Sequence, residues 1–196
     1  MYGAMKRAVD LVGALALLLV SAPFLLLLCL AICLDSPGPA IFAQWRVGRG
    51  HKLFRMYKLR TMIPGAQKDA RDIVEEEEIF AQRRDDPRVT RVGRVLRKLS
   101  LDELPQLLNV LKGEMSFVGP RPFVLPESNR LPVAALHRLD VRPGITGYAQ
   151  AEGRSDADAV ERLARDLYYV GHMDWWLDLR ILWRTFSTVF HSEGSC

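Results

Sequence analysis

Two adjacent carboxylates, Asp102 and Glu103, stand directly before a segment with the pattern of a helix. Leucines at helical spacing follow at positions 104, 107, 108 and 111, and Gly113 is a natural helix end. Pro105 is compatible with the first turn, because the backbone N–H groups there have no helical partner. Those N–H groups are partly positive, so the helix start favours both the carboxylates and an incoming phosphate.

The surroundings of the acidic pair favour chemistry on a phosphate over a simple helix cap. An isolated Asp-Glu pair at a helix start usually does no more than cap it. Here Arg97 and Lys98 precede the pair, and a Gly-Pro-Arg-Pro turn at 119–122 presents Arg121 after the helix. Carboxylates beside cations and a rigid turn suit phosphoryl transfer, in which the cations neutralise phosphate oxygens.

A cationic stretch at 46–60 offers further phosphate ligands. It contains six Lys or Arg residues and no acid. Phe54, Met56 and Leu59 intersperse with Lys58 and Arg60, which predicts a short strand with one apolar and one cationic face. The alternative is a juxtamembrane patch attracted to anionic lipid by about 1 kcal/mol per charge.

Residues 11–34 predict a membrane anchor, because they contain no charge over 24 positions. No small-x-small cleavage site follows before charged residues, which argues against a signal peptide. A spanning helix is the default for this length. Two features favour a helix that bends at 21–23 and returns to the same face. Pro23 removes a helical hydrogen bond at the midpoint, and basic residues flank both ends, so that both flanks qualify as cytoplasmic.

Three further segments have patterns that indicate contact with the membrane or with a ligand. Residues 88–99 combine apolar spacing with basic residues, as in helices at a membrane interface. Residues 174–190 predict a tryptophan-rich helix that fits either the headgroup zone or core packing. The glycines of 142–154 allow close approach to a ligand, and the alternative is an ordinary pair of loops.

Length and composition bound the remaining possibilities. A chain of 196 residues predicts one domain with a sizeable core and room for an appendage. The net charge of +4 allows membrane surfaces, nucleic acid or phosphorylated ligands as partners. The three cysteines are too few and too badly placed for a disulfide framework, and no cluster has zinc-ligand spacing.

Taken together, these motifs resemble the signature of the bacterial sugar transferases, the small monotopic phosphoglycosyl transferases. The likeness extends over about residues 6–190, with the motifs in the family's order. The matching segments are Lys6-Arg7 with Asp10, then 38–48, 54–62, 86–93, 100–122, 142–147 and 166–170. Three positions depart from the family pattern: Ala22 separates Ser21 from Pro23, Tyr148 stands in place of Trp, and Glu152 in place of Asn.

The resemblance implies an α+β, mostly helical, membrane-associated globular domain. Residues 1–35 would form a re-entrant helix-break-helix anchor, and 36–196 a cytoplasmic catalytic domain in which 64–86 is a variable linker or helix. Interfacial amphipathic helices would hold this domain on the cytoplasmic face of the bacterial inner membrane.

The implied reaction moves a sugar 1-phosphate from a nucleoside diphosphate sugar, with uridine as the expected nucleoside, to polyprenyl (undecaprenyl) phosphate. It is the first membrane step in assembling an exopolysaccharide or glycoconjugate. Asp102 would be the nucleophile that forms an aspartyl phosphosugar and would also bind Mg²⁺, with Glu103 as the second catalytic residue. The candidates for binding phosphate or substrate are Lys58, Arg60, Arg97, Arg121, Arg142 and Arg154.

Two functions of other classes stay open. A metal-dependent nucleotide-sugar pyrophosphatase would use water in place of Asp102 and would need no lipid. A basic membrane adaptor would bind anionic lipid or nucleic acid, but it gives the acidic pair and the Gly-Pro-Arg-Pro turn no role. We expect membrane lipids and not nucleic acid as partners. The sequence leaves the sugar, the polyprenol length, the glycan and the oligomeric state undetermined.

Overall fold

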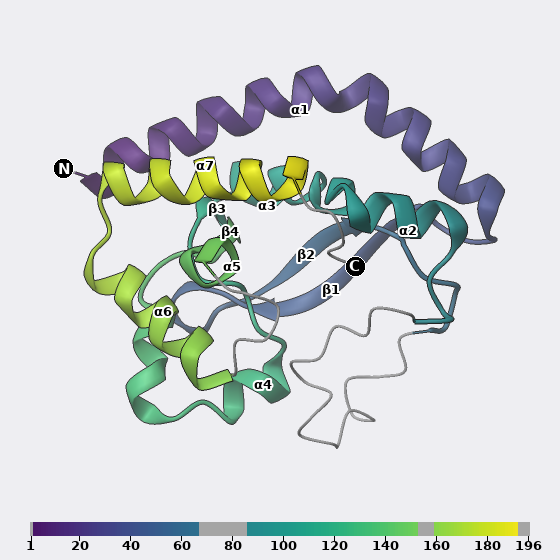
Figure 1. Cartoon of the computed structure of the whole chain (residues 1–196). Coiled ribbons are helices and arrows are strands. Elements are labelled where there is room, and N and C mark those ends of the chain that lie inside the picture. The colour runs from purple at the N-terminus through teal and green to yellow at the C-terminus, as the bar shows by residue number, and fades with distance from the viewer. Residues whose placement is uncertain (1, 67–85, 153–158, 192–196) are drawn as a thin grey trace.

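The computed structural model describes residues 2–66, 86–152 and 159–191 (Figure 1). Within them the chain is mostly helical, with two small two-stranded sheets, which confirms the predicted α+β class. The helices are α1 (Tyr2–Asp35), α2 (Arg91–Lys98), α3 (Gln106–Lys112), α4 (Leu125–Asn129), α5 (Tyr148–Glu152), α6 (Ala159–Gly171) and α7 (Trp175–His191). The strands are β1 (Ile41–Val47), β2 (Leu53–Leu59), β3 (Ser116–Val118) and β4 (Gly144–Thr146). The 3-10 segments are η1 (Arg49–His51), η2 (Leu101–Glu103) and the longer η3 (Val133–Leu139).

The apolar N-terminal segment forms one long helix, α1, which arches over the rest of the molecule (Figure 1). By length and composition it is the single helix in the described part of the chain that is able to cross a membrane, and little of its apolar window is buried. The predicted break at 21–23 is a curve instead, because the helix continues through Pro23. Ser21 donates a hydrogen bond to the carbonyl of Leu18, 3.4 Å away, next to the backbone group that Pro23 leaves without a donor.

Both ends of α1 are fastened to the globular part. Near the N-terminus, the buried carboxylate of Asp10 accepts a hydrogen bond from the backbone N–H of Phe117 at 3.2 Å. At the other end, Asp35 accepts one from the N–H of Val92 at 3.0 Å. Ile32 packs in an apolar cluster with residues of β2 and α2. Between these anchors the outward face of the arch is apolar and exposed; Val20, for example, is 81% exposed.

The predicted strand is β2, and β1 is its partner. They pair antiparallel, with Phe42 opposite Lys58. Phe54 and Met56 of β2 are buried in a core cluster with α1 and α3, as the apolar alternation predicted. The helix predicted after the acidic pair is α3, which ends at Gly113 with a φ of +83°. The other sheet is a short parallel pair of β3 and β4.

The tryptophan-rich helix is α7, and the exposure of its residues distinguishes the two predicted alternatives, core packing and the headgroup zone. Its inner residues, Leu177 and Ile181, are buried against Tyr169 and Val118. Trp176 and Trp183 are 79% and 73% exposed. Core packing is therefore wrong for these two tryptophans. The basic segment is helical too, as α2, and it leaves Val95 and Leu99 exposed. The variable segment 64–86 lies mostly outside the described residues, at 67–85.

Candidate functional site

The acidic pair lies where three elements meet. Ser100, in the left-handed conformation with a φ of +53°, turns the chain from α2 into η2, which carries both carboxylates. Pro105, with a φ of −62°, then directly precedes α3, as predicted. Strand β2 runs beside η2 and supplies Lys58.

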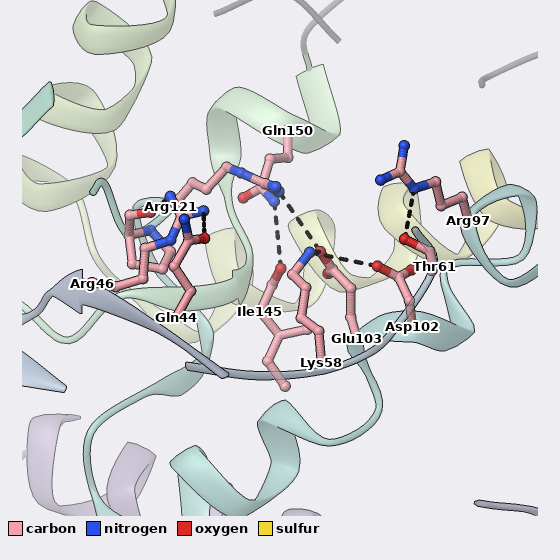
Figure 2. A network of polar contacts seen from close by, with 11 residues as sticks. Gln44, Arg46, Lys58, Thr61, Arg97, Asp102, Glu103, Arg121, Ile145 and Gln150 are labelled. Carbon is pink, nitrogen blue, oxygen red and sulfur yellow. Dashed lines mark hydrogen bonds and ion pairs between the residues drawn. The ribbon is translucent and has the colours of Figure 1, made fainter. Parts of the chain in front are cut away.

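Lys58 bridges the two carboxylates (Figure 2). Its Nζ lies 2.8 Å from Oε1 of Glu103 and 3.6 Å from Oδ2 of Asp102. From the other side, Nη1 of Arg121 lies 3.8 Å from the same Glu103 oxygen. Glu103 therefore takes most of the compensating positive charge, and Asp102 takes less.

The pKa values of the two carboxyls move in opposite directions for this reason. Burial raises the pKa of Asp102, and Lys58 opposes that rise only in part, while the neighbouring Glu103 charge adds to it. Burial would also raise the pKa of Glu103, but Lys58, Arg121 and a hydrogen bond from Gln106 outweigh it and lower the pKa. The site thus holds one firmly paired carboxylate and one poorly solvated, weakly paired carboxylate. The second kind is suited to nucleophilic attack.

Arg97 borders the site from α2. Its Nε donates to Oγ1 of Thr61 at 2.9 Å, and Figure 2 shows the outer nitrogens of its guanidinium pointing away from that contact. The helix approaches Thr61 closely because residue 93 is glycine. A Cβ there would clash with the Thr61 carbonyl group. A phosphate bound at Asp102 would lie between cations on both sides.

The structure also shows site residues that the sequence reasoning missed. Arg46 of β1 donates to Oε1 of Gln44 at 2.7 Å, beside Arg121, and Gln150 of α5 lies above Arg121 (Figure 2). Burial, then the charge of Arg121, lowers the pKa of Arg46 to about 10. The position of Arg46 in the cationic stretch was the available signal for it. Gln150 lies in the glycine-containing segment 142–154, whose predicted approach to a ligand was the available signal for it. A small cavity lies here; its lining is Met56, Lys58, Glu103, Gln106, Arg121, Pro122, Gly144 and Ile145.

Two predicted ligands do not join this cluster. Arg60 is 8% exposed, and its guanidinium donates to the carbonyls of Pro37 and Ser36, beyond the end of α1. Its role is therefore to fasten α1 to β2. The Nε of Arg142 donates to the Gly113 carbonyl at 2.9 Å, at the end of α3. Arg154 lies outside the described residues.

The reassignment of Arg60 predicts a loss of stability without a loss of chemistry. Arg60→Lys removes part of a buried guanidinium network that an ammonium cannot reproduce. We expect the free energy of unfolding to fall by about 1–3 kcal/mol, with turnover per folded molecule changed less than about twofold. Thermal unfolding in detergent measures the first quantity and a substrate-saturated assay the second. Arg130→Lys, at an exposed position, is the control. A large loss of turnover at unchanged stability would return Arg60 to the phosphate site.

The carboxylates of the site suit a magnesium ion whose remaining ligands come from the substrate phosphates and water. The described residues contain no group of three or more His, Cys, Asp or Glu side chains placed to hold a metal. They do offer the adjacent carboxylates of Asp102 and Glu103. Mg²⁺ is commonly held by one or two carboxylates together with substrate phosphates and water, so this pair fits such a site.

Comparison with known proteins relates nearly the whole chain to one family. The family model described as "Bacterial sugar transferase" matches residues 1–192. A UDP-glucose:undecaprenyl-phosphate glucose-1-phosphate transferase of Caulobacter vibrioides is 46% identical over 97% of this chain and 71% of its own length. The exopolysaccharide production protein PSS of Rhizobium leguminosarum is 42% identical over 92% of both chains.

Some relatives are much longer. The undecaprenyl-phosphate galactose phosphotransferase of Salmonella typhimurium is 39% identical over 97% of this chain but only 41% of its own length. The present chain thus spans less than half of that relative.

Proposed function

The chain belongs to the bacterial sugar transferase family and is a transferase, and from this premise we propose that it moves a sugar 1-phosphate from a UDP-sugar to undecaprenyl phosphate. The donor and acceptor follow the names of the relatives, among them the Caulobacter enzyme. The observation in this chain that carries the proposal is the unequal pairing of Asp102 and Glu103 around Lys58.

The reaction would proceed in two displacements at one phosphorus. Asp102 attacks the phosphorus that bears the sugar; its Oδ–P bond forms as the bond from that phosphorus to the nucleotide's bridging oxygen breaks, and nucleoside monophosphate leaves. An oxygen of the lipid phosphate then attacks the aspartyl phosphosugar and releases Asp102. The product is polyprenyl diphosphate sugar.

The surrounding residues have separate tasks in this scheme. Lys58 neutralises charge on the phosphoryl oxygens once substrate competes with the carboxylates for its ammonium, and Arg121 and Arg97 do so from the two sides. Glu103 holds Lys58 in place at 2.8 Å. When bound by Asp102 and substrate oxygens, Mg²⁺ would supply further neutralisation of phosphate charge.

The position of α1 supports a monotopic, re-entrant arrangement on the cytoplasmic face of the inner membrane. Asp10 and Asp35, near its two ends, bind the same globular part, so both ends belong on one side of a bilayer. The exposed apolar face of the arch would enter the leaflet, and the exposed Trp176 and Trp183 fit the headgroup zone. Two-sided attachment is what favours this arrangement over a spanning helix.

A single radiolabel assay tests the function. Purified enzyme is incubated with Mg²⁺ and a panel of UDP-sugars labelled in the sugar, with and without undecaprenyl phosphate. We expect label in the organic phase only when the lipid is present, and equimolar release of UMP. Release of free sugar phosphate without lipid would indicate the pyrophosphatase instead. Vesicle binding without turnover of any sugar nucleotide would indicate the adaptor.

A further inference from the structure

The Gly-Pro-Arg-Pro turn that carries Arg121 is held by its backbone carbonyls. Four consecutive carbonyls, from 120 to 123, each accept a hydrogen bond from a different donor. The pairs are Gly144 N to Pro120 O at 3.0 Å, Arg138 Nη2 to Arg121 O at 2.7 Å, Arg46 Nη1 to Pro122 O at 3.2 Å, and Val47 N to Phe123 O at 2.9 Å. The prolines remove two backbone donors from the turn, so its position depends mainly on these acceptors, together with the N–H of Gly119, which donates to the Thr146 carbonyl at 2.9 Å.

The guanidinium of Arg121 itself is held loosely. Its side chain is 41% exposed, and its ion-pair distance to Glu103 is 3.8 Å. A side chain with so few fixed contacts is aimed mainly by its own backbone. The donor to the Arg121 carbonyl is therefore the contact that most directly sets where this guanidinium can reach.

That donor, Arg138 of η3, is itself buried and bound by residues of other elements. It is 2% exposed, and both its Nε and Nη2 bond Oδ2 of the buried Asp166 in α6, at 3.2 and 2.6 Å. Its guanidinium also lies over the ring of Phe123, 3.7 Å from the centroid. A buried arginine is costly unless it is paired and hydrogen-bonded, and Asp166 pairs with it through Nε and Nη2; the buried Nη1 has no hydrogen-bond partner among the described residues. Arg138 thereby joins α6 to the backbone of Arg121, the proposed phosphate-binding arginine.

We infer that the buried pair of Arg138 and Asp166 positions Arg121 for phosphate binding during transfer. The inference rests on the proposed function, and it makes Arg138 a positioning residue, because it reaches the site only through the Arg121 backbone. The competing explanation is that the pair merely packs η3 against α6. In that case its loss would lower stability without any dependence on the side chain at 121.

A double-mutant cycle separates these explanations. Arg138→Lys keeps a counter-ion for Asp166, but one ammonium does not reproduce the fork that also reaches the Arg121 carbonyl. We expect Arg138→Lys to lower kcat/KM by about tenfold when residue 121 is arginine, and by less than about twofold in the Arg121→Ala background. Equal losses in the two backgrounds would overturn the inference.

Arg7→Lys is the matched control. Arg7 also donates from its guanidinium to backbone carbonyls, those of Val110 and Leu111 at 2.7 and 3.2 Å, at the far end of α3. Its effect on kcat/KM should be the same with and without the Arg121 side chain. Phe123→Leu provides a milder perturbation in case Arg138→Lys folds poorly, because it removes only the ring under the guanidinium. It should show the same coupling to Arg121 at smaller size.

Hydrogen exchange tests the positioning without any need for turnover. In Arg138→Lys, the amides of 116–125 and that of Val47, which donates to the Phe123 carbonyl, should exchange several-fold faster than in the natural chain, while those of 53–59 keep their rates. Uniformly faster exchange, or none, would overturn the local effect. If the natural chain shows no transferase activity, the proposed function fails, and the exchange pattern still decides whether Arg138 holds the turn.

Discussion

Asp102→Asn should lower turnover by a factor of about a thousand or more while leaving the fold intact, because a neutral amide is a far weaker nucleophile toward phosphorus than a carboxylate. Asn is nearly isosteric with Asp, and the ion pair that Asp102 makes with Lys58 in the described part of the chain is a long one, at 3.6 Å. The thermal unfolding temperature should therefore stay close to that of the natural chain. Burial raises the pKa of Asp102, which means that the folded protein disfavours its charged form. Replacing it with a neutral side chain should therefore not lower the stability of the fold.

The proposed covalent step gives this prediction a second readout. With a UDP-sugar and Mg²⁺ but no lipid, the natural enzyme should release up to one equivalent of UMP and retain the labelled sugar phosphate, and Asp102→Asn should do neither. Steady-state kinetics with both substrates should be ping-pong, because the first product leaves before the lipid reacts. Asp140→Asn, whose side chain is 65% exposed, is the control and should keep full activity. Kinetics of a ternary complex, with no retained label, would favour direct attack by the lipid phosphate.

Replacing Ser21 and Pro23 together with leucine should change which side of the membrane the N-terminus occupies. The curve in α1 depends on Pro23, and a straight apolar helix of this length is able to span the bilayer. We expect the N-terminus of the double variant to appear on the outer side in a large share of molecules. Its activity should fall in parallel, since the contact of Asp10 with Phe117 is lost in those molecules.

Cysteine labelling in intact cells measures the topology. Gly3→Cys and Trp45→Cys introduce the probes, in a background with the native cysteines replaced. A Cβ on Gly3 meets no atom within 4 Å, and Trp45 is 59% exposed, so neither probe disturbs packing. Both should resist an impermeant reagent when α1 is natural. Val20→Leu, which keeps Pro23, is the control. Labelling of one probe from outside in the natural α1 would contradict the re-entrant arrangement.

The local elements were predictable because their signals are local. Alternation in 53–60 indicated β2, leucine spacing and Gly113 indicated α3, and the cationic face of the predicted strand indicated Lys58. The curve of α1 was only half predicted. Pro23 removes one hydrogen bond, but tertiary contacts at both helix ends keep the rest of the helix continuous.

The arginines show where sequence reasoning stops. Strand alternation places the side chains of Lys58 and Arg60 on one face, yet Arg60 turns to carbonyls that follow α1. Those acceptors lie more than twenty positions away in the chain, so no nearby residue signals them. Arg138 likewise has partners that are distant in the chain, in α6 and in the turn at 119–122. Long-range acceptors for a guanidinium are a property of the fold.

In the proposed membrane arrangement, the attachment of Arg60 would set the depth at which the reaction takes place. Arg60 is bound to the chain just past the end of α1, and Lys58 lies only two residues before it, which is about 7 Å along an extended backbone. The acceptor phosphate would therefore be met at headgroup level, and its isoprenoid tail would stay in the hydrocarbon. Because so short a backbone segment sets this height, the enzyme should tolerate bilayers of different thickness.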